Sequence, residues 1–458
     1  MSSGNNRRNQ RVVTAKNKNE KFGNNAERKR STYKSNSDKR LQGKEATKTS
    51  KPKQKPRPSS NVNVTKPKQK PKKKRFQNNI HIVVSEGSPD YFLMILVLVL
   101  TITGIIMIYS ASSYSASIDY GDEFFFARKQ FILAFIGCSV MIILGFTNII
   151  NYTVLKKYAT LPKLIYGVTI LMLVLVPLIG IEVNGQKRWL GIPNTSFQIQ
   201  PSEIAKHALI IFMAYYLSSS SNKLRSFKDY CKALFFALLP SSLTLNSNLS
   251  TTIILAVIGI GMIFIASPYF LRLVAIGVGG IVLCVSALVL YLNTSGGYHN
   301  ARFVAWKNPF EYSQDTGFQT VQSLLAIGSG GAFGLGLGKG RQKLEYIPEA
   351  HNDIIFAVIC EELGFLGATL LLSIFCLLFW RCVKIAVNAK DTFGSLIVAG
   401  VTIMLAVQTI INVSVVTNTI PNTGIGLPFI SYGGTSILFL LSMMGIVLNI
   451  SKYKRFNV

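Results

Sequence analysis

Charged residues are scarce in this sequence, and acidic ones are scarcer still. Asp, Glu, Lys and Arg make up 15% of the 458 residues, whereas hydrophobic residues make up 49%, and mean hydropathy is +0.34. That balance excludes an ordinary soluble protein and is typical of a protein that crosses a membrane several times. The formal net charge is +29, and most of it lies at the N-terminus, where residues 1–75 hold 25 Lys and Arg against 4 Asp and Glu.

The sequence also lacks the motifs of several chemistries. Its six cysteines form no CxxC pair and no Cys/His cluster, so we expect neither a disulfide nor a structural zinc. The start has no short apolar segment followed by a small-residue cleavage site, so we expect no cleavable signal peptide. The glycine-rich run at 328–340 is not a P-loop, because Gly340 follows Lys339 where Ser or Thr is needed. This run predicts a flexible hinge, and an ATP-driven pump is disfavoured.

Residues 1–85 form a basic segment rich in Asn, Lys, Ser and Pro, with the near-repeats KPKQKPRPSS and KPKQKPKKKRF. Large apolar residues are too few to offset the entropy of ordering, so we expect a disordered tail. Three roles stay open for it. A solvated cytoplasmic tether is favoured over contact with anionic membrane lipids, where each Lys or Arg contributes about 1 kcal/mol. A nucleic-acid-binding arm is disfavoured because interleaved aromatics are missing, and we expect no nucleic-acid partner.

Residues 86–458 predict an all-α polytopic membrane domain with about ten transmembrane helices. Apolar runs long enough to span a bilayer, about 20 residues each, lie near 91–111, 130–147, 164–181, 204–219, 232–246, 251–267, 271–292, 354–380, 394–417 and 430–450. The fifth run is short and contains Pro240, so 232–267 could also be a broken pair of helices. Basic residues recur in alternate loops, which predicts that both termini are cytoplasmic by the positive-inside rule.

Two predicted outer loops carry charge despite that rule. They are residues 182–203 and the long stretch 293–353, which precedes the eighth span. Loops longer than about 15 residues are usually functional or disordered. The aromatic residues of 293–353 predict that this loop packs on the membrane face.

Asp353 lies where a charged stretch passes into an apolar span. A carboxyl group at the edge of hydrocarbon is partly desolvated, which raises its pKa and suits it to act as a general base. The alternative is a helix N-cap, a position that favours Asp, and spacing alone favours the cap. Glu361 and Glu362 lie inside the same span, where carboxylates are functional candidates by default.

Two pairs of charged residues lie near the other outer loop. Lys187 and Arg188 stand outside against the positive-inside bias, which indicates an anionic ligand such as a diphosphate, or interfacial anchoring beside Trp189. Glu203 and Lys206 are three residues apart at a helix start and predict a pair on the helix surface.

Four motifs stand out together: NGQKRW, QPSEIAK, the long stretch at 318–367 that contains RQKLEYIPEAHND, and LPFISYGGTS. They resemble the SEDS family (shape, elongation, division and sporulation) of FtsW, RodA and SpoVE proteins. The resemblance covers about residues 90–455, and RQKLEYIPEAH is more similar to FtsW than to RodA. The sequence departs from the family pattern where SNLST replaces PDLGT, giving Asn248 and Ser250, and at Thr423, where FtsW proteins often have Lys.

The resemblance implies ten membrane helices and a peptidoglycan glycosyltransferase whose donor and acceptor is lipid II, the undecaprenyl-diphosphate disaccharide pentapeptide. The implied partners are a class B penicillin-binding protein that supplies the transpeptidase, other divisome proteins and membrane lipids. The implied location is the cytoplasmic membrane of a bacterium, at the division septum. Asp353 matches the essential family carboxylate. We expect substrate-binding residues at Arg188, Lys187, Lys206, Glu203, Arg302, Gln319, Glu345, His351, Ser431 and Tyr432.

The implied reaction is attack by the 4-hydroxyl of an acceptor GlcNAc on C1 of a donor MurNAc. Asp353 would take the hydroxyl proton, and Arg188, with Lys206 or Lys187, would stabilise charge on the diphosphate. No cofactor is certain; Mg²⁺ or Mn²⁺ could assist, although no ligand cluster in the sequence demands a metal. A lipid II flippase and a non-enzymatic division scaffold are the alternative functions.

Overall fold

The computed structural model describes residues 82–147, 151–183, 186–191, 198–219, 224, 226–245, 247–267, 269, 274, 277, 304–314, 317–341 and 349–457. Contacts divide the chain into two units. One comprises Val83–Phe456 with Met1–Arg11, and the other comprises Val12–Ile82 with Asn457–Val458. Nearly all of the second unit lies outside the described residues, as do the predictions for the basic tail and most of the predicted span at 271–292.

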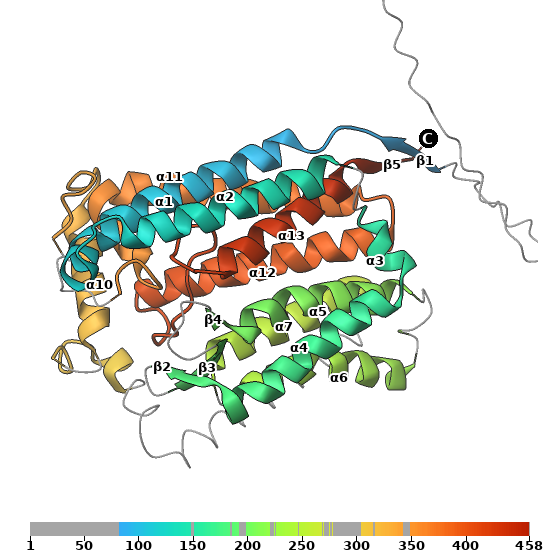
Figure 1. Cartoon of the computed structure of the whole chain (residues 1–458), viewed down its shortest axis with the longest axis horizontal. Helices are drawn as coiled ribbons and strands as arrows, with labels where there is room; N and C mark the ends of the chain where they lie inside the picture. Colours follow the sequence, from blue (N-terminus) through green and yellow to red (C-terminus); the bar gives the residue numbers. More distant parts are fainter. Residues whose placement is uncertain are drawn as a thin grey trace, which may run out of the picture. The chain divides into compact units, whose positions relative to one another are not determined.

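The described part of the chain is mainly helical (Figure 1). Its helices are α1 (Tyr91–Tyr120), α2 (Phe125–Phe146), α3 (Thr153–Lys157), α4 (Thr160–Ile179), α5 (Pro201–Ser218), α6 (Phe227–Thr244), α7 (Leu249–Ala266), α10 (Phe318–Gly330), α11 (Ile355–Val387), α12 (Thr392–Val416) and α13 (Ser436–Ser451). Short strands β1 (Ile82–Glu86) and β5 (Tyr453–Asn457) pair with each other. Strands β2 (Ile181–Val183), β3 (Gln186–Gly191) and β4 (Gln198–Ile199) form a second small sheet.

The chain is a multi-pass membrane protein. Within the described residues, six helices are long and apolar enough to cross a bilayer, namely α1, α2, α4, α7, α11 and α12. All the predicted spans except the seventh coincide with a described helix, while the count of ten stays a prediction. The sequence did not predict the small sheet around the loop 182–203, because its strands are only two to six residues long.

The alternative left open for 232–267 is settled in favour of two separate helices. The Tyr230 hydroxyl lies 2.5 Å from Ser267 Oγ, and Thr244 Oγ1 lies 2.9 Å from Thr252 Oγ1. The first contact joins the start of α6 to the residue that follows α7, and the second joins the end of α6 to the start of α7. The two helices are therefore antiparallel neighbours joined by a short turn.

Helix α12 links two groups of helices, because it packs against α11 and also against α5 and α7. In Figure 1, α1, α2 and α13 lie above α12, and α4 to α7 lie below it. Glycines allow close approach of α2 and α13. A Cβ on Gly445 would lie 2.9 Å from Met141 Cα, and one on Gly145 would lie 3.0 Å from Leu448 Cβ. Small residues at such contacts are the usual means of packing helices in lipid.

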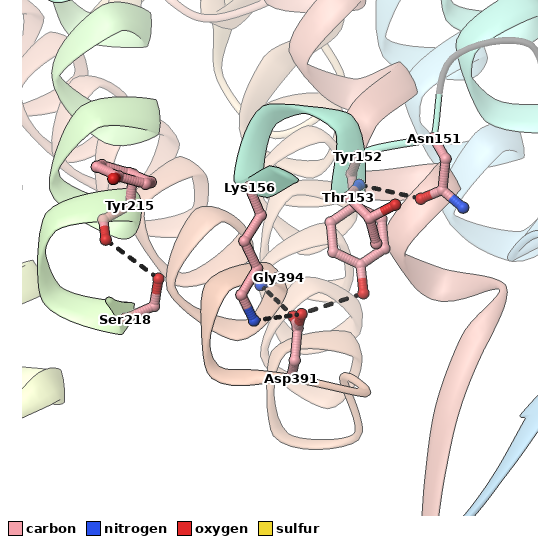
Figure 2. Close-up of polar contacts among 8 residues, drawn as sticks. All are labelled: Asn151, Tyr152, Thr153, Lys156, Tyr215, Ser218, Asp391 and Gly394. Carbon is pink, nitrogen blue, oxygen red and sulfur yellow. Dashed lines mark hydrogen bonds and ion pairs between the residues drawn. The ribbon is translucent and has the colours of Figure 1, made fainter. Parts of the chain in front are cut away.

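One end of the bundle is basic, and we call it the basic end. Asp391 forms an ion pair with Lys156 at 3.1 Å and lies 3.5 Å from the Tyr152 hydroxyl, as Figure 2 shows. Arg381, near the end of α11, donates from Nε to Asp90 at 2.7 Å. Burial and the charge of Asp391 raise the pKa of the Tyr152 phenol, so this group stays neutral. These contacts tie α1, α3, α11 and α12 together at the level of their basic loops.

The opposite end of the bundle lies one membrane thickness away. Ser110 is 20 residues after Asp90 along α1, and Asn412 is 21 residues after Asp391 along α12. At 1.5 Å per residue, both lie about 30 Å from the basic end, which is the thickness of a hydrocarbon core. Because Asn412 binds the main chain of Asp353, the charged join that the sequence marks lies at this far membrane edge.

Candidate functional site

Asp353 lies in the turn that leads into α11. It is half-buried, whereas the N-cap of the helix is Ile354, which makes no side-chain cap hydrogen bond. The N-cap interpretation of Asp353 is therefore wrong. Gly424 passes beside the carboxylate with φ of +67°, and a Cβ there would lie 3.7 Å from Asp353 Oδ2. The backbone of this loop thus forms one wall of the site.

Asn412 joins the two segments that meet at Asp353. Its side chain is completely buried, and Nδ2 donates to the Asp353 carbonyl at 2.6 Å and to the Ile425 carbonyl at 2.7 Å. The sequence interpretation missed this residue. A polar side chain within a predicted membrane span is the signal that could have identified it.

His351 and Tyr432 are brought together by the fold. Tyr432 N donates to the His351 carbonyl at 2.9 Å, and the two rings pack edge to face with centroids 5.5 Å apart. Phe126 of α2 lies 4.2 Å from the imidazole. Burial lowers the pKa of His351 to about 4, so this imidazole is neutral near pH 7. The fold therefore supplies no cation at His351, although it lies two residues from Asp353.

Two predicted site residues support loops through their side chains. Ser431 Oγ accepts a hydrogen bond from Leu427 N at 2.6 Å, which closes the turn of the LPFIS segment. Gln319 on α10 accepts from Asn422 Nδ2 at 2.6 Å, two residues before Gly424. Both residues therefore shape the wall beside Asp353. Arg302 and Glu345 lie outside the described residues.

Arg188 lies on β3, and its Nε donates to the Ser247 carbonyl at 2.7 Å. A small pocket here has apolar walls from α4 and α6 and polar walls from Arg188, Ser202, Ser247 and Asn248, among others. Ser202 is in the first turn of α5, and Asn248 is the N-cap of α7. Two helix N-termini and a guanidinium thus converge on one pocket. That arrangement favours an anion, because helix N-termini carry partial positive charge.

Lys187 and Lys206 are not among the described residues that line this pocket. Lys187 is exposed, and neighbouring residues of a strand point to opposite faces. Lys206 is almost fully buried and forms an ion pair with Glu203 at 2.8 Å. The predicted helix-surface pair is thus a largely buried pair, in which the Glu203 carboxylate offsets the Lys206 charge.

The start of α7 connects Arg188 with Asp353. Ser250 Oγ donates to the Thr423 carbonyl at 2.8 Å, and Thr423 precedes the glycine that borders Asp353. Two of the three departures from the family pattern, Ser250 and Thr423, therefore meet in one hydrogen bond. The third, Asn248, caps α7 by accepting from Thr251 N at 3.0 Å.

The glycine-rich run packs against α11 rather than forming a free hinge. Helix α11 is interrupted at Gly364, which has φ of +70°. Leu335 N and Gly336 N donate to the carbonyls of Glu361 and Glu362, at 2.9 and 3.0 Å. The loop main chain thus takes up hydrogen bonds that the broken helix leaves open.

The carboxylates of Glu361 and Glu362 are also held by this loop. Arg341 N donates to Glu361 Oε1 at 2.7 Å, and Gly338 N donates to Glu362 Oε2 at 3.1 Å. Ser110 of α1 donates to Glu362 at 2.7 Å. Both carboxylates are completely buried. The amides that a phosphate-binding loop would present to a ligand therefore bind the protein's own carboxylates.

One known protein family matches nearly the whole membrane domain. The family model for cell cycle proteins of the FtsW, RodA and SpoVE type matches residues 91–456. The chain belongs to the FtsW/RodA/SpoVE family. The match contains all the described helices, and it leaves out the basic tail.

Curated relatives of this family align over most of the chain. Stage V sporulation protein E of Bacillus subtilis (strain 168) is 41% identical over 379 residues, which cover 81% of this chain and 99% of the relative. A probable peptidoglycan glycosyltransferase FtsW of Geobacter sp. (strain M18) is 37% identical, with 80% of this chain and 97% of the relative covered. The FtsW protein of Trichlorobacter lovleyi is 39% identical, with coverage of 79% and 93%.

Solved structures share the fold. A chain from a peptidoglycan synthase complex that coordinates polymerisation and crosslinking aligns with a TM-score of 0.65 at 24% identity, covering 79% of this chain and 97% of that chain. The rod shape determining protein RodA of Thermus thermophilus aligns with a TM-score of 0.57 at 25% identity, covering 79% and 96%. The helical membrane arrangement described above is therefore the fold of this family.

Proposed function

We propose that this chain is a peptidoglycan glycosyltransferase that polymerises lipid II at the outer face of the cytoplasmic membrane. The observation that carries the proposal is the half-buried carboxylate of Asp353, at the membrane edge about 30 Å from the basic end. Membership of the FtsW/RodA/SpoVE family supports the same activity, since relatives carry the name peptidoglycan glycosyltransferase.

In the proposed reaction, the 4-hydroxyl of the acceptor GlcNAc attacks C1 of the donor MurNAc. The new C1–O bond forms as the bond from C1 to the diphosphate oxygen breaks, and its electron pair leaves with undecaprenyl diphosphate. Asp353 accepts the hydroxyl proton, a role for which a carboxylate at the hydrocarbon edge is suited. Arg188 stabilises the negative charge that develops on the leaving diphosphate, together with the N-termini of α5 and α7.

In this proposal Arg188 stabilises the diphosphate without help from Lys187 or Lys206. Its pocket lies between two helix starts, while Lys206 is paired with Glu203. The proposed reaction needs no Mg²⁺ or Mn²⁺. Within the described residues, no group of three or more His, Cys, Asp or Glu side chains is arranged to hold a metal ion. Polymerisation measured with and without a chelator tests whether a divalent cation contributes.

We further propose that both termini are cytoplasmic and that the chain works with a class B penicillin-binding protein and other divisome proteins at the septum. The basic residues at the end opposite Asp353 support this orientation. The likeness to a chain of a peptidoglycan synthase complex supports a transpeptidase partner. Relatives named FtsW and SpoVE support a septal role, in vegetative division or in sporulation.

The test is polymerisation of lipid II by the purified full chain, with and without its co-purified partner, for wild type, Asp353→Asn and a control. Asn keeps the shape of Asp but does not act as a base near neutral pH, so we expect a loss of 10²-fold or more, roughly the scale of general-base catalysis. The control is Glu349→Gln, which removes an exposed carboxylate from the same turn and should retain turnover.

The same preparation separates the alternatives. Transfer of labelled lipid II between the leaflets of a vesicle, without polymer, would indicate a flippase. Neither polymer nor transfer, with partner binding intact, would indicate a scaffold. Near-normal polymer from well-folded Asp353→Asn would remove the base from the proposed mechanism.

A further inference from the structure

We propose that Asn412 is a positioning residue for the general base Asp353, an inference that rests on the proposed function. One amide group of α12 sets the distance between the Asp353 turn and the loop wall opposite it. The three segments involved are α12 itself, the turn before α11 and the turn at 423–425, which are brought together only by the fold.

The hydrogen bonds of Asn412 account for this role. Its Nδ2 donates one hydrogen to the Asp353 carbonyl at 2.6 Å and the other to the Ile425 carbonyl at 2.7 Å. Neutral amides are the uncharged side chains that offer two donors on one nitrogen. Gln would add a methylene in a fully buried position. Asn is therefore the uncharged residue that can bridge two carbonyls at this separation.

The two carbonyls that Asn412 binds belong to the segments that carry and border the proposed base. The Asp353 carbonyl belongs to the same residue as the proposed base. Ile425 follows Gly424, and a Cβ added to Gly424 would lie 3.7 Å from Asp353 Oδ2. Without the amide, the two carbonyls would lose the donor that they share, and losing a hydrogen bond is costly at a buried carbonyl such as that of Ile425. We expect the turns to separate and the carboxylate to move with them.

The far side of the 423–425 turn is anchored independently. Ser250 Oγ of α7 donates to the Thr423 carbonyl at 2.8 Å, and α7 begins beside the Ser247 carbonyl that accepts from Arg188. The position of the 423–425 turn relative to Arg188 is therefore set by α7 and does not depend on Asn412. Loss of Asn412 would displace Asp353 relative to that wall, and hence relative to the proposed diphosphate pocket.

The main experiment is a double-mutant cycle of Asn412→Ala and Asp353→Asn, measured as steady-state polymerisation over a range of lipid II concentrations, per folded molecule of the full chain. Misplacement by about 1 Å costs on the order of 10²-fold in rate, so we expect Asn412→Ala to lower kcat by about that factor with KM for lipid II little changed. In the Asp353→Asn background, Asn412→Ala should have no further effect, because there is no base left to position.

Two further variants keep the test decisive. Thr409→Val is the matched control, because Thr409 is buried on the same helix and its hydroxyl donates to the Leu405 carbonyl of that helix; it should leave kcat unchanged. Asn412→Asp keeps the shape of the side chain and loses the double donor, so it should lower kcat as Asn412→Ala does. It takes the place of Asn412→Ala if the smaller residue unfolds the protein. Ser250→Ala releases the other side of the turn and should lower kcat several-fold.

The outcomes distinguish this inference from the proposed function. If Asp353→Asn keeps wild-type turnover, the proposed base is wrong. If Asp353→Asn is inactive while folded Asn412 variants keep wild-type kcat, the positioning role alone is overturned. Equal losses from Asn412→Ala in both backgrounds would also overturn it, because they would show an effect that does not pass through Asp353.

Discussion

Acid should destabilise the site through His351. The imidazole is 6% exposed and packs against Phe126 and Tyr432, and burial lowers its pKa to about 4. In the unfolded chain the pKa is about 6.5. Between these values the unfolded state binds a proton that the folded state does not. The stability that His351 contributes is therefore present in full above its pKa in the unfolded chain, and it is lost as pH falls through its pKa in the folded protein.

The size of the effect follows from the two pKa values. Relative to pH 8, linkage gives a loss of about 2 kcal/mol at pH 5 and about 3 kcal/mol below pH 4, taking 1.36 kcal/mol per pKa unit. A change of that size is a large share of the stability of a typical domain. Because the His351 carbonyl binds Tyr432 N, the opening should begin in the turn that carries Asp353.

The assay is thermal unfolding of the purified protein in detergent between pH 8 and pH 4.5, for wild type and His351→Gln. Gln stays neutral over this range, so the variant lacks the proton that His351 takes up on unfolding. The variant should be less stable at pH 8, where it lacks the ring contacts, and the difference from wild type should shrink as pH falls. A pH-independent difference between the two proteins would refute the assignment of a buried neutral imidazole.

The remaining predictions concern Arg188 and topology. Arg188→Ala should lower polymerisation of lipid II by roughly 10²-fold, since loss of one preorganised donor to a developing charge costs on the order of 3 kcal/mol; exposed Lys187→Ala should change it little, and equal losses in both variants would contradict the pocket assignment. Cysteine introduced at Ser313 of a cysteine-free variant should react with an impermeant reagent in cells whose outer barriers are permeabilised, whereas protection would reverse the proposed orientation.

The sequence predicted most of the membrane helices because the bilayer imposes a simple physical requirement. A span needs about 20 apolar residues, since backbone groups in hydrocarbon must be paired within a helix. Nine of the ten predicted runs coincide with described helices. The same reasoning identified Asp353, since charge next to a span is rare enough to be noticed.

Roles of individual side chains were harder to predict, because they depend on neighbours distant in sequence. Lys206 was expected to help with the diphosphate, yet its charge is offset by Glu203. The glycine-rich run was interpreted as a flexible hinge. Its amides instead fill the break in α11 and bind Glu361 and Glu362. The sequence around Lys206 did not show that its charge would be offset in a buried ion pair, and the sequence of the glycine-rich run did not show that it would bind α11.

The sequence by itself determined that this is a multi-pass membrane protein with a charged join at Asp353, because hydrophobic length and charge placement are local properties. Only the tertiary structure decided what surrounds that carboxylate. Asn412, Gly424 and Ser250 come from segments separated by up to 174 residues. Asn412 and Gly424 lie beside Asp353, and Ser250 holds the turn that contains Gly424, because α12 packs against α11 and α7. Hydrogen bonds and buried contacts of this kind form only when the helices pack against one another, so they cannot be predicted from local patterns in the sequence.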